Sequence, residues 1–365
     1  MGCGVSRLPS RSNEFLALTT RPASSGSAGS VVPLLQKAKQ QSTTAEPPIT
    51  TAGTSSAEPA IAETASSSST LPARMAGKRA NYELLERLGA GAYAEVHRAR
   101  NPEHTSNGIP EFVAIKSIDV SRVEGGMGSI EHEAMIMEMV GEHPHIATLY
   151  EEFELPASGL YCLVIELIAG GELFDRVAAK GAYAEDDASL ILAELVDALT
   201  YLHGLGIVHR DVKPENICFA TADAASPTRL IDFGYAAVLA LDGSRERELG
   251  PSGYCGTARY LAPEQLVEGA PDTVAHDMWA AGVVLYILLS GFPPFTAPIP
   301  QLFDDIKAGV YDFPSPEWDR VSDDAKDLVR ALLTVDPEKR MTAEQVARHQ
   351  WVVTCGGALD GGLEA

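Results

Sequence analysis

Two segments in the middle of the chain carry residue types that suit phosphate chemistry. In the first, Asp211 is followed two residues later by Lys213 and five residues later by Asn216. The second ends in Asp232, directly after a short strand-like run. Transfer of a phosphoryl group needs a carboxylate to orient the attacking hydroxyl, a cation near the phosphate and oxygen ligands for Mg²⁺. These four side chains supply that set, and we predict that they converge on one site.

Three features upstream suit the same chemistry. Glycines in Leu88–Val96 would let a hairpin cover phosphates with its backbone N–H groups, although such a hairpin alone is more often an ordinary turn. Lys116 lies on the apolar face of a predicted strand at 112–118, where the alternative is an edge lysine that reaches water. Glu133 lies on the apolar stripe of a predicted helix, and a buried carboxylate is costly unless it meets a cation. We therefore expect Lys116 and Glu133 to pair.

The elements that would position these residues are also indicated by the sequence. A helix is expected from about 185 to 204, because acidic residues favour helix N-termini and glycine favours C-termini. The segment that contains Asp211 comes next, and a short strand at 217–219 follows it. Strand-like or helix-like apolar spacing continues from about 82 to 353, without a visible internal repeat.

The composition excludes several classes of protein. The 365 residues contain 28 Lys and Arg against 50 Asp and Glu, a formal net charge of −22, which does not suit nucleic acid as a partner. The five cysteines form no CxxC pair, so neither a disulfide framework nor a zinc ribbon fits, and a reducing intracellular compartment is the simpler interpretation. The longest apolar run, Met278–Leu289, is well short of the roughly 20 residues that a transmembrane helix needs.

The first 80 residues differ in composition from the rest. They contain 8 Lys and Arg, 4 Asp and Glu and a single aromatic residue, Phe15, and they are dominated by Ser, Thr, Ala and Pro. Such a segment cannot bury enough apolar surface to offset the entropy of ordering. We predict a disordered tail at 1–80 and compact structure from about residue 80.

The order of these segments resembles that of the eukaryotic Ser/Thr protein kinases, from about Tyr82 to Val353. Further landmarks in the order typical of that family are Gly256–Glu264, Asp277–Trp279 and Asp336–Arg340. Gly170–Asp175 and Gly291–Phe295 resemble the calcium/calmodulin-dependent and calcium-dependent kinase group. The resemblance implies an α+β fold of two lobes. A small β-rich N-lobe with one main helix is expected at about 82–165, a larger helical C-lobe at about 169–353, and a short tail at 354–365.

The family resemblance also implies an activity and a role for each site residue. The activity is ATP- and Mg²⁺-dependent phosphorylation of Ser or Thr hydroxyls in proteins. Asp211 would orient the hydroxyl, Lys213 would neutralise the transferring phosphoryl group, and Asn216 and Asp232 would hold Mg²⁺. The implied ATP-binding residues are Leu88, Gly89, Ala90, Gly91, Ala94, Val96, Ala114, Lys116, Glu133, Glu166 and Ile168.

Substrate contacts are implied for Glu172, Glu215 and Thr257. The two glutamates match positions at which relatives recognise arginine upstream of the phosphorylated residue, and the alternative is that both are ordinary surface acids. Protein substrates with basic Ser or Thr motifs are therefore expected, in line with the acidic net charge.

Some features limit the resemblance. Ala94 replaces the third glycine of the loop, which the backbone N–H groups should tolerate. No twelve-residue Ca²⁺ loop and no basic amphipathic helix after Val353 are present, so direct calcium control is not expected. Two other functions stay open. A catalytically weak pseudokinase tethered to membrane is disfavoured by the presence of Lys116, Asp211 and Asp232, and a small-molecule kinase is disfavoured by the peptide-docking resemblance of the segment that contains Thr257.

The first six residues fit an acceptor for N-myristoylation at Gly2, with Cys3 suited to palmitoylation. Two acyl chains, or one chain with basic residues, anchor a protein stably to a membrane. We expect a cytoplasmic kinase associated with membrane through this end, as the resemblance to plant and protist calcium-dependent kinases also implies. An organellar transit peptide and an inert disordered leader remain the alternatives.

Overall fold

The computed structural model describes residues 74–76, 81–91, 93–123, 125–239, 258–267 and 269–355, all within one compact unit of the chain. The predictions on Gly2, Cys3 and Thr257 lie outside these residues. Among the helices that these ranges contain, none combines the length and the apolar character that crossing a bilayer requires.

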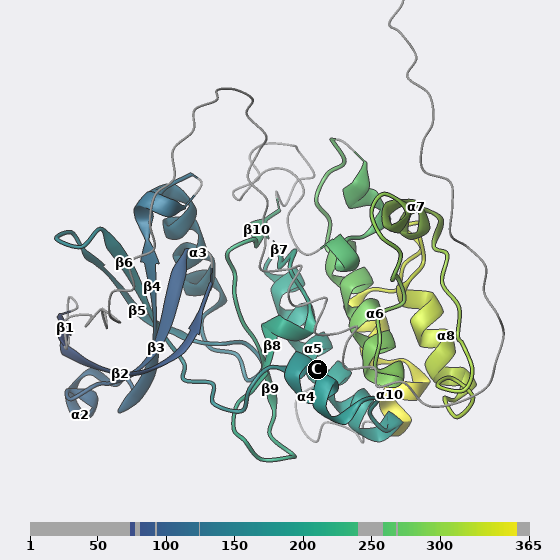
Figure 1. Ribbon diagram of the computed structural model, residues 1–365, viewed down its shortest axis with the longest axis horizontal. Helices are drawn as coiled ribbons and strands as arrows, with labels where there is room; N and C mark the ends of the chain where they lie inside the picture. The colour runs from purple at the N-terminus through teal and green to yellow at the C-terminus, as the bar shows by residue number, and fades with distance from the viewer. Residues whose placement is uncertain are drawn as a thin grey trace, which may run out of the picture. The chain divides into compact units, whose positions relative to one another are not determined.

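A six-stranded antiparallel sheet forms the smaller lobe (Figure 1). In spatial order its strands are β1 (Arg74–Ala76), β2 (Asn81–Ala90), β3 (Ala94–Arg100), β4 (Phe112–Asp119), β6 (Leu160–Ile165) and β5 (Leu149–Leu155). Compact structure was expected from about residue 80, and β1 begins slightly earlier. Its three residues join the sheet through backbone pairing with β2. No apolar pattern in the sequence predicts this strand.

The side chains of β4 alternate between the two faces of this sheet. Val113 and Ile115 pack in the hydrophobic cluster of one face, while Ile118 packs in the cluster of the other. The second face is covered by the main helix of the lobe, α3 (Met127–Val140), and Lys116 shares that face because strand residues alternate with period two. The short helix α2 (His104–Asn107) lies between β3 and β4 in the chain.

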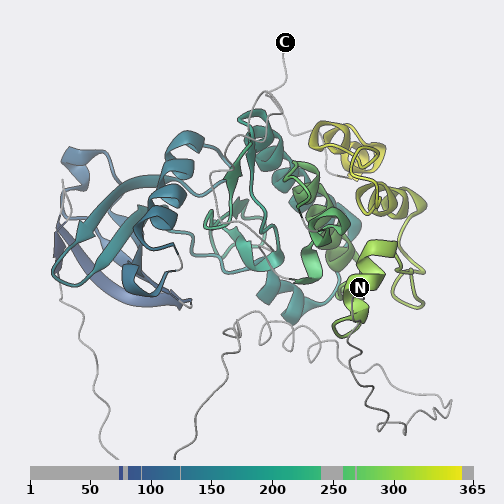
Figure 2. The same ribbon diagram turned by 90° about the horizontal axis from the view of Figure 1, so that it is seen from above.

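The larger lobe is built from helices (Figures 1 and 2). They are α4 (Leu173–Lys180), α5 (Glu185–Gly204), α6 (Ala275–Ser290), α7 (Gln301–Ala308), α8 (Asp323–Leu332), α9 (Ala343–Ala347) and α10 (Gln350–Cys355). Helix α6 is apolar on almost every side and is buried in the middle of the lobe, in contact with α5 and α8. It contains the longest apolar run of the sequence, which is thus core.

Two small two-stranded sheets lie on this lobe and hold the segments of chemical interest. Strand β7 (Ile207–Val208) pairs with β10 (Ala237–Val238), and β8 (Ile217–Phe219) pairs with β9 (Thr228–Leu230). The helix expected at about 185–204 and the strand expected at 217–219 are confirmed. The predicted fold class, a small β-rich lobe and a larger helical lobe, is confirmed as well.

Candidate active site

The loop between β7 and β8 carries three of the predicted site residues. Its backbone is fixed from below by the buried carboxylate of Asp277 in α6, which accepts hydrogen bonds from the N–H groups of His209 and Arg210 at 2.9 Å each. Arg210 has φ +67°, a left-handed conformation that costs a non-glycine residue about 1–3 kcal/mol. Asp277 therefore holds the loop in a backbone conformation that it would not adopt alone. Asp277 is thus a buried carboxylate that caps the backbone of this loop.

Asp211, Lys213 and Asn216 meet within this loop. The Oδ2 atom of Asp211 accepts hydrogen bonds from Lys213 Nζ at 2.6 Å and from Asn216 Nδ2 at 2.9 Å. The same Asn216 nitrogen donates to the main-chain oxygen of Asp211 at 2.8 Å. The carboxylate is thus held by two donors through Oδ2, and among the described residues no donor occupies Oδ1, which can take another partner.

Burial raises the pKa of the Asp211 carboxyl above its usual range even though Lys213 opposes the shift, and the charge of Asp232 adds to it. Asp232 is therefore close enough to Asp211 for their charges to interact, although the two residues come from different segments. The two segments are also joined by His209, whose Nε2 lies 3.2 Å from the main-chain oxygen of Ile231. The sequence analysis did not predict a role for His209. Its position two residues before Asp211 was the only indication that it could belong to the site.

Lys116 connects the sheet to Asp232 and to α3. Its Nζ lies 2.6 Å from Glu133 Oε1 and 3.0 Å from Asp232 Oδ1. The expected ion pair between Lys116 and Glu133 is thus present, and Glu133 is 6% exposed on the buried side of α3. One cation is shared by two carboxylates, which leaves the cluster with an excess of negative charge.

The pKa values of this cluster follow from that sharing. Burial lowers the pKa of Lys116, but the carboxylates of Asp232 and Glu133 outweigh it and raise that pKa above its usual range. Lys116 lowers the pKa of Asp232 to about 2. Burial raises the pKa of Glu133, and Lys116 opposes this shift. Asp232 is therefore the carboxylate that stays ionised most firmly at neutral pH.

Asn216 and Asp232 present oxygen atoms of the kind that Mg²⁺ binds. Both bonds from Nδ2 of Asn216 go to acceptors of Asp211, which fixes this atom as the nitrogen and turns the amide oxygen to the other side. Asp232 accepts the hydrogen bond of Lys116 through Oδ1, so with respect to the described residues Oδ2 is available to a metal ion. Amide and carboxylate oxygens are hard ligands, and Mg²⁺ usually takes one or two protein groups together with phosphates. The residues present fit the ion.

The predicted nucleotide-contact residues lie on β2, β3, β4 and the segment after β6. Gly89, Ala90 and Gly91 are at the turn from β2 to β3, where Gly91 N donates to Ala94 O at 2.8 Å. A side-chain carbon placed on Gly89 would meet nothing within 4 Å, so packing does not require this glycine. The same sheet carries Leu88, Val96 and Ala114.

Directly after β6, the chain crosses between the two lobes at Glu166–Ile168. The N–H of Glu166 donates to Thr148 O at 2.8 Å, and its carboxylate accepts from Arg229 at 3.1 Å. Ile165 is the last residue of β6. The connection is therefore anchored on one side to Thr148, the residue directly before β5, and on the other side to Arg229 of β9 on the helical lobe.

Glu172 and Glu215, the predicted substrate acids, are neighbours on the helical lobe. Glu172 precedes α4 and forms an isolated backbone bridge with Cys218, a few residues after Glu215. Burial raises the pKa of Glu215, Lys213 opposes the shift, and the charges of Asp211 and Glu172 add to it. The Oε2 atom of Glu215 is buried and makes no hydrogen bond to the residues that the structure describes.

Lower in the same lobe, Arg340 is fully buried and pairs with Glu264. The two N–O distances are 2.6 and 2.9 Å, so the pair is bidentate and braces this lobe. Two further titratable residues close to it, Asp272 and His276, were not predicted. His276 lies next to the apolar run that begins at Met278, and its position in the sequence is typical of a residue in the hydrophobic core.

The fold and the site together define a protein kinase. The family described as protein kinase domain matches residues 82–352, and the chain belongs to this family. It is similar to calcium/calmodulin-dependent protein kinase type 1B of Homo sapiens and of Rattus norvegicus, each 43% identical over 272 residues, 74% of this chain and 75% of the relative. Calcium/calmodulin-dependent protein kinase type 1 of Macrobrachium nipponense is 40% identical over 273 residues, 74% of each chain. The protein is a Ser/Thr protein kinase.

Proposed function

We propose that this kinase transfers the γ-phosphate of ATP, in the presence of Mg²⁺, to Ser or Thr hydroxyls of proteins with basic residues upstream of the target. The observation that carries the proposal is the shared ion pair of Lys116, which joins Glu133 of α3 and Asp232 of the helical lobe at 2.6 and 3.0 Å. This contact brings a phosphate-binding cation next to an oxygen ligand for a metal.

Each polar group of the loop then has a task. Oδ1 of Asp211 accepts the hydrogen bond of the substrate hydroxyl and orients its oxygen toward the phosphate, and the raised pKa of this carboxyl favours its acting as a base. Lys213, held at 2.6 Å by Oδ2 of the same carboxylate, offsets negative charge on the transferring group. A pseudokinase would lack one of the groups that Lys116, Asp211 and Asp232 provide.

The nucleotide would be held by the sheet and by the connection between the lobes. Main-chain groups of Glu166 and Ile168 face adenine, and the turn at Gly89–Gly91 covers the phosphates with N–H groups, as the open space beside Gly89 permits. Asn216 and Asp232 would hold Mg²⁺, which when bound neutralises and aligns the β- and γ-phosphates.

The substrate motif is proposed from Glu172 and Glu215. The Glu172 carboxylate lies close enough to Glu215 to help raise the pKa of Glu215, and a buried oxygen of Glu215 makes no hydrogen bond to a described residue, so the two acids form a site for a cation. A guanidinium suits it better than an ammonium because its planar fork pairs with carboxylates through two hydrogen bonds. Arginine upstream of the target is therefore the expected signal.

Two matched peptides test the activity and the motif together. One has arginine upstream of a serine and the other has glutamine at that position, and both are offered with Mg-ATP. A charged hydrogen bond contributes about 1.5–3 kcal/mol, so we expect kcat/KM to be roughly 10–100-fold higher for the arginine peptide. The variant Glu215→Gln, which keeps the shape of the side chain, should lose most of this preference. Equal rates for the two peptides contradict the motif alone, whereas no transfer to either peptide contradicts the proposed activity.

Membrane association is proposed from the sequence at Gly2 and Cys3. Mass spectrometry of the mature N-terminus from a eukaryotic host should show an acylated Gly2 after loss of Met1, and Gly2→Ala should abolish the modification and release the kinase from membranes. A mature chain that starts near residue 40–75 supports a transit peptide instead, and an unmodified start at residue 1 or 2 supports an inert leader.

A further inference from the structure

A buried histidine of α6 lies beside the loop that carries Asp211. His276 is 3% exposed, and its two ring nitrogens face two different carboxylates. Nδ1 lies 3.5 Å from Asp272 Oδ1, and Nε2 lies 3.8 Å from Glu264 Oε1. Among the described residues neither ring nitrogen has a partner at normal hydrogen-bond geometry. The ring is thus placed between two acids rather than bonded closely to one.

Both of these acids also hold an arginine. Glu264 is paired with Arg340, and Asp272 Oδ1 lies 3.4 Å from Arg210 Nε. The Asp272 oxygen that faces His276 is the same atom that faces Arg210, so one carboxylate oxygen stands between an imidazole and a guanidinium. Burial works to raise the pKa of Asp272, but the hydrogen-bonding position of His276 and the charge of Arg210 outweigh it and lower that pKa.

Only the protonated ring satisfies both acids. A neutral imidazole carries one N–H, so it donates to one carboxylate and turns a lone pair toward the other. The imidazolium carries two N–H groups and can donate to Asp272 and Glu264 at once. Within the described part of the chain, the other charged groups near the ring are Arg210, Arg340 and Asp277, and each has an ionic or hydrogen-bonded partner of its own.

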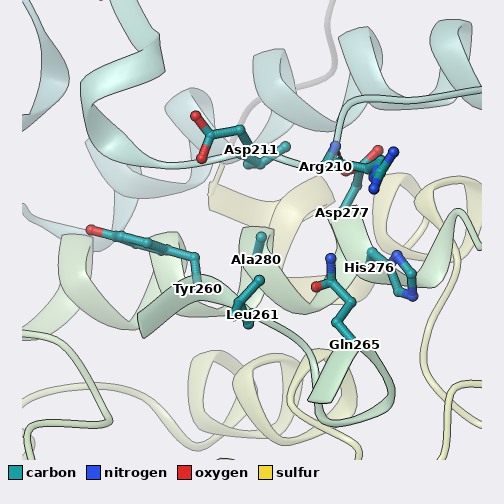
Figure 3. Close-up of a pocket in the computed structure, with 9 residues that line it drawn as sticks. Arg210, Asp211, Tyr260, Leu261, Gln265, His276, Asp277 and Ala280 are labelled. Atoms are coloured by element: carbon teal, nitrogen blue, oxygen red, sulfur yellow. Dashed lines mark hydrogen bonds between the residues drawn. The ribbon is translucent and has the colours of Figure 1, made fainter. Parts of the chain in front are cut away.

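This cluster reaches the catalytic loop through Arg210. Arg210 directly precedes Asp211, its backbone has the left-handed φ of +67°, and its side chain is 3% exposed. Figure 3 shows a cavity with Arg210, Asp277 and His276 at one side and Asp211 and Tyr260 at the other. Its volume of about 10 Å³ is room for about one water molecule. The strained residue before Asp211 is therefore held by Asp277 at its backbone and by Asp272 at its side chain.

We infer that His276 is a positioning residue for catalysis: its imidazolium holds Asp272 against Arg210 and so keeps Asp211 in its working position. Loss of the second N–H of the ring loosens Asp272 and lowers turnover, so the contribution of His276 falls as the pH rises. The inference rests on the role proposed above for Asp211. It concerns kcat, since none of these residues belongs to the predicted nucleotide contacts.

The test is the ratio of kcat between wild type and His276→Gln, measured from pH 6 to 8.5 with saturating Mg-ATP and peptide. The ratio removes the pH dependence that the two proteins share. We expect about a tenfold ratio at pH 6, the scale of a small displacement of a catalytic group, and a ratio near one at pH 8.5. KM for ATP should stay within about twofold, because no nucleotide contact changes.

A second pair of variants makes the result decisive. Asp272→Asn should show the same pH trend, and the double variant should be no slower than the slower single one, because both changes remove the same restraint. Asp272→Asn also carries the test if His276→Gln does not fold. His349→Gln is the matched control, since His349 lies 4.0 Å from Asp327 and contacts no part of the loop. A ratio independent of pH, or additive effects, overturns the inference, whereas an inactive wild type overturns the proposed activity instead.

Discussion

Replacing Asp211 by asparagine is expected to lower kcat for peptide phosphorylation by about 10²–10⁴-fold, the contribution of a positioned general base. The amide cannot accept the proton of the substrate hydroxyl, and it offers Lys213 a neutral oxygen in place of the carboxylate that lies 2.6 Å away. The measurement is steady-state phosphate transfer from Mg-ATP to a Ser/Thr peptide, with wild type and Asp211→Asn side by side.

The fold should survive this substitution. Asparagine has the shape of aspartate, and Lys213 keeps the nearby charges of Glu215 and Asp232, which also act on its pKa. We therefore expect thermal unfolding within a few degrees of wild type and a nearly unchanged KM for ATP. Equal turnover of the two proteins would show that Asp211 does not have the assigned role.

Replacing Lys116 by methionine should cost about 10²–10³-fold in kcat/KM for ATP. The change removes the cation proposed to contact the phosphates, and removal of one such preorganised electrostatic contact typically costs about 10²–10³-fold in rate. Steady-state kinetics with ATP as the varied substrate give the loss. A variant that keeps wild-type kcat/KM contradicts the proposed phosphate contact of Lys116.

The same variant has a predictable pH dependence of stability. Burial already raises the pKa of Glu133, and without Lys116 that carboxyl becomes still harder to ionise. A raised folded-state pKa means that the folded state is favoured when the group is protonated, so the stability lost by Lys116→Met should be smaller near pH 5 than near pH 8. Thermal unfolding at the two pH values measures this difference in stability.

For the loss of activity in Lys116→Met, Glu133→Gln is the control. Glutamine still accepts the hydrogen bond from Lys116, so this variant should lose far less activity.

Local patterns were sufficient to predict much of this site. Glu133 interrupts an apolar helical stripe, and Lys116 lies on the apolar face of a strand, so each implied a buried partner of opposite charge. The structure pairs the two at 2.6 Å. The α5 helix was predictable for a similar reason, because acidic residues at its start and glycines at its end mark both boundaries.

The network around His276 was not predictable in the same way. His276 follows Asp272 by four residues and faces Glu264, 12 residues earlier in the chain, while Asp272 faces Arg210, 62 residues before it. The periodicity of one helix or strand cannot predict a contact between residues of different segments, and the sequence around His276 is typical of an ordinary hydrophobic core. Strand β1 escaped prediction for another reason, since backbone pairing alone recruits Arg74–Ala76 to the sheet.

The contact between Lys116 and Asp232 has a mechanical consequence. It ties a strand of one lobe to a loop of the other, so any hinge motion that opens the enzyme must pull this ion pair apart. Opening would then return Asp232 toward an ordinary acidity and leave Lys116 with Glu133 alone. Entry of nucleotide is therefore coupled to a change in the charges around Lys116, because both require the ion pair with Asp232 to break. Ionic strength affects both, since salt weakens this ion pair.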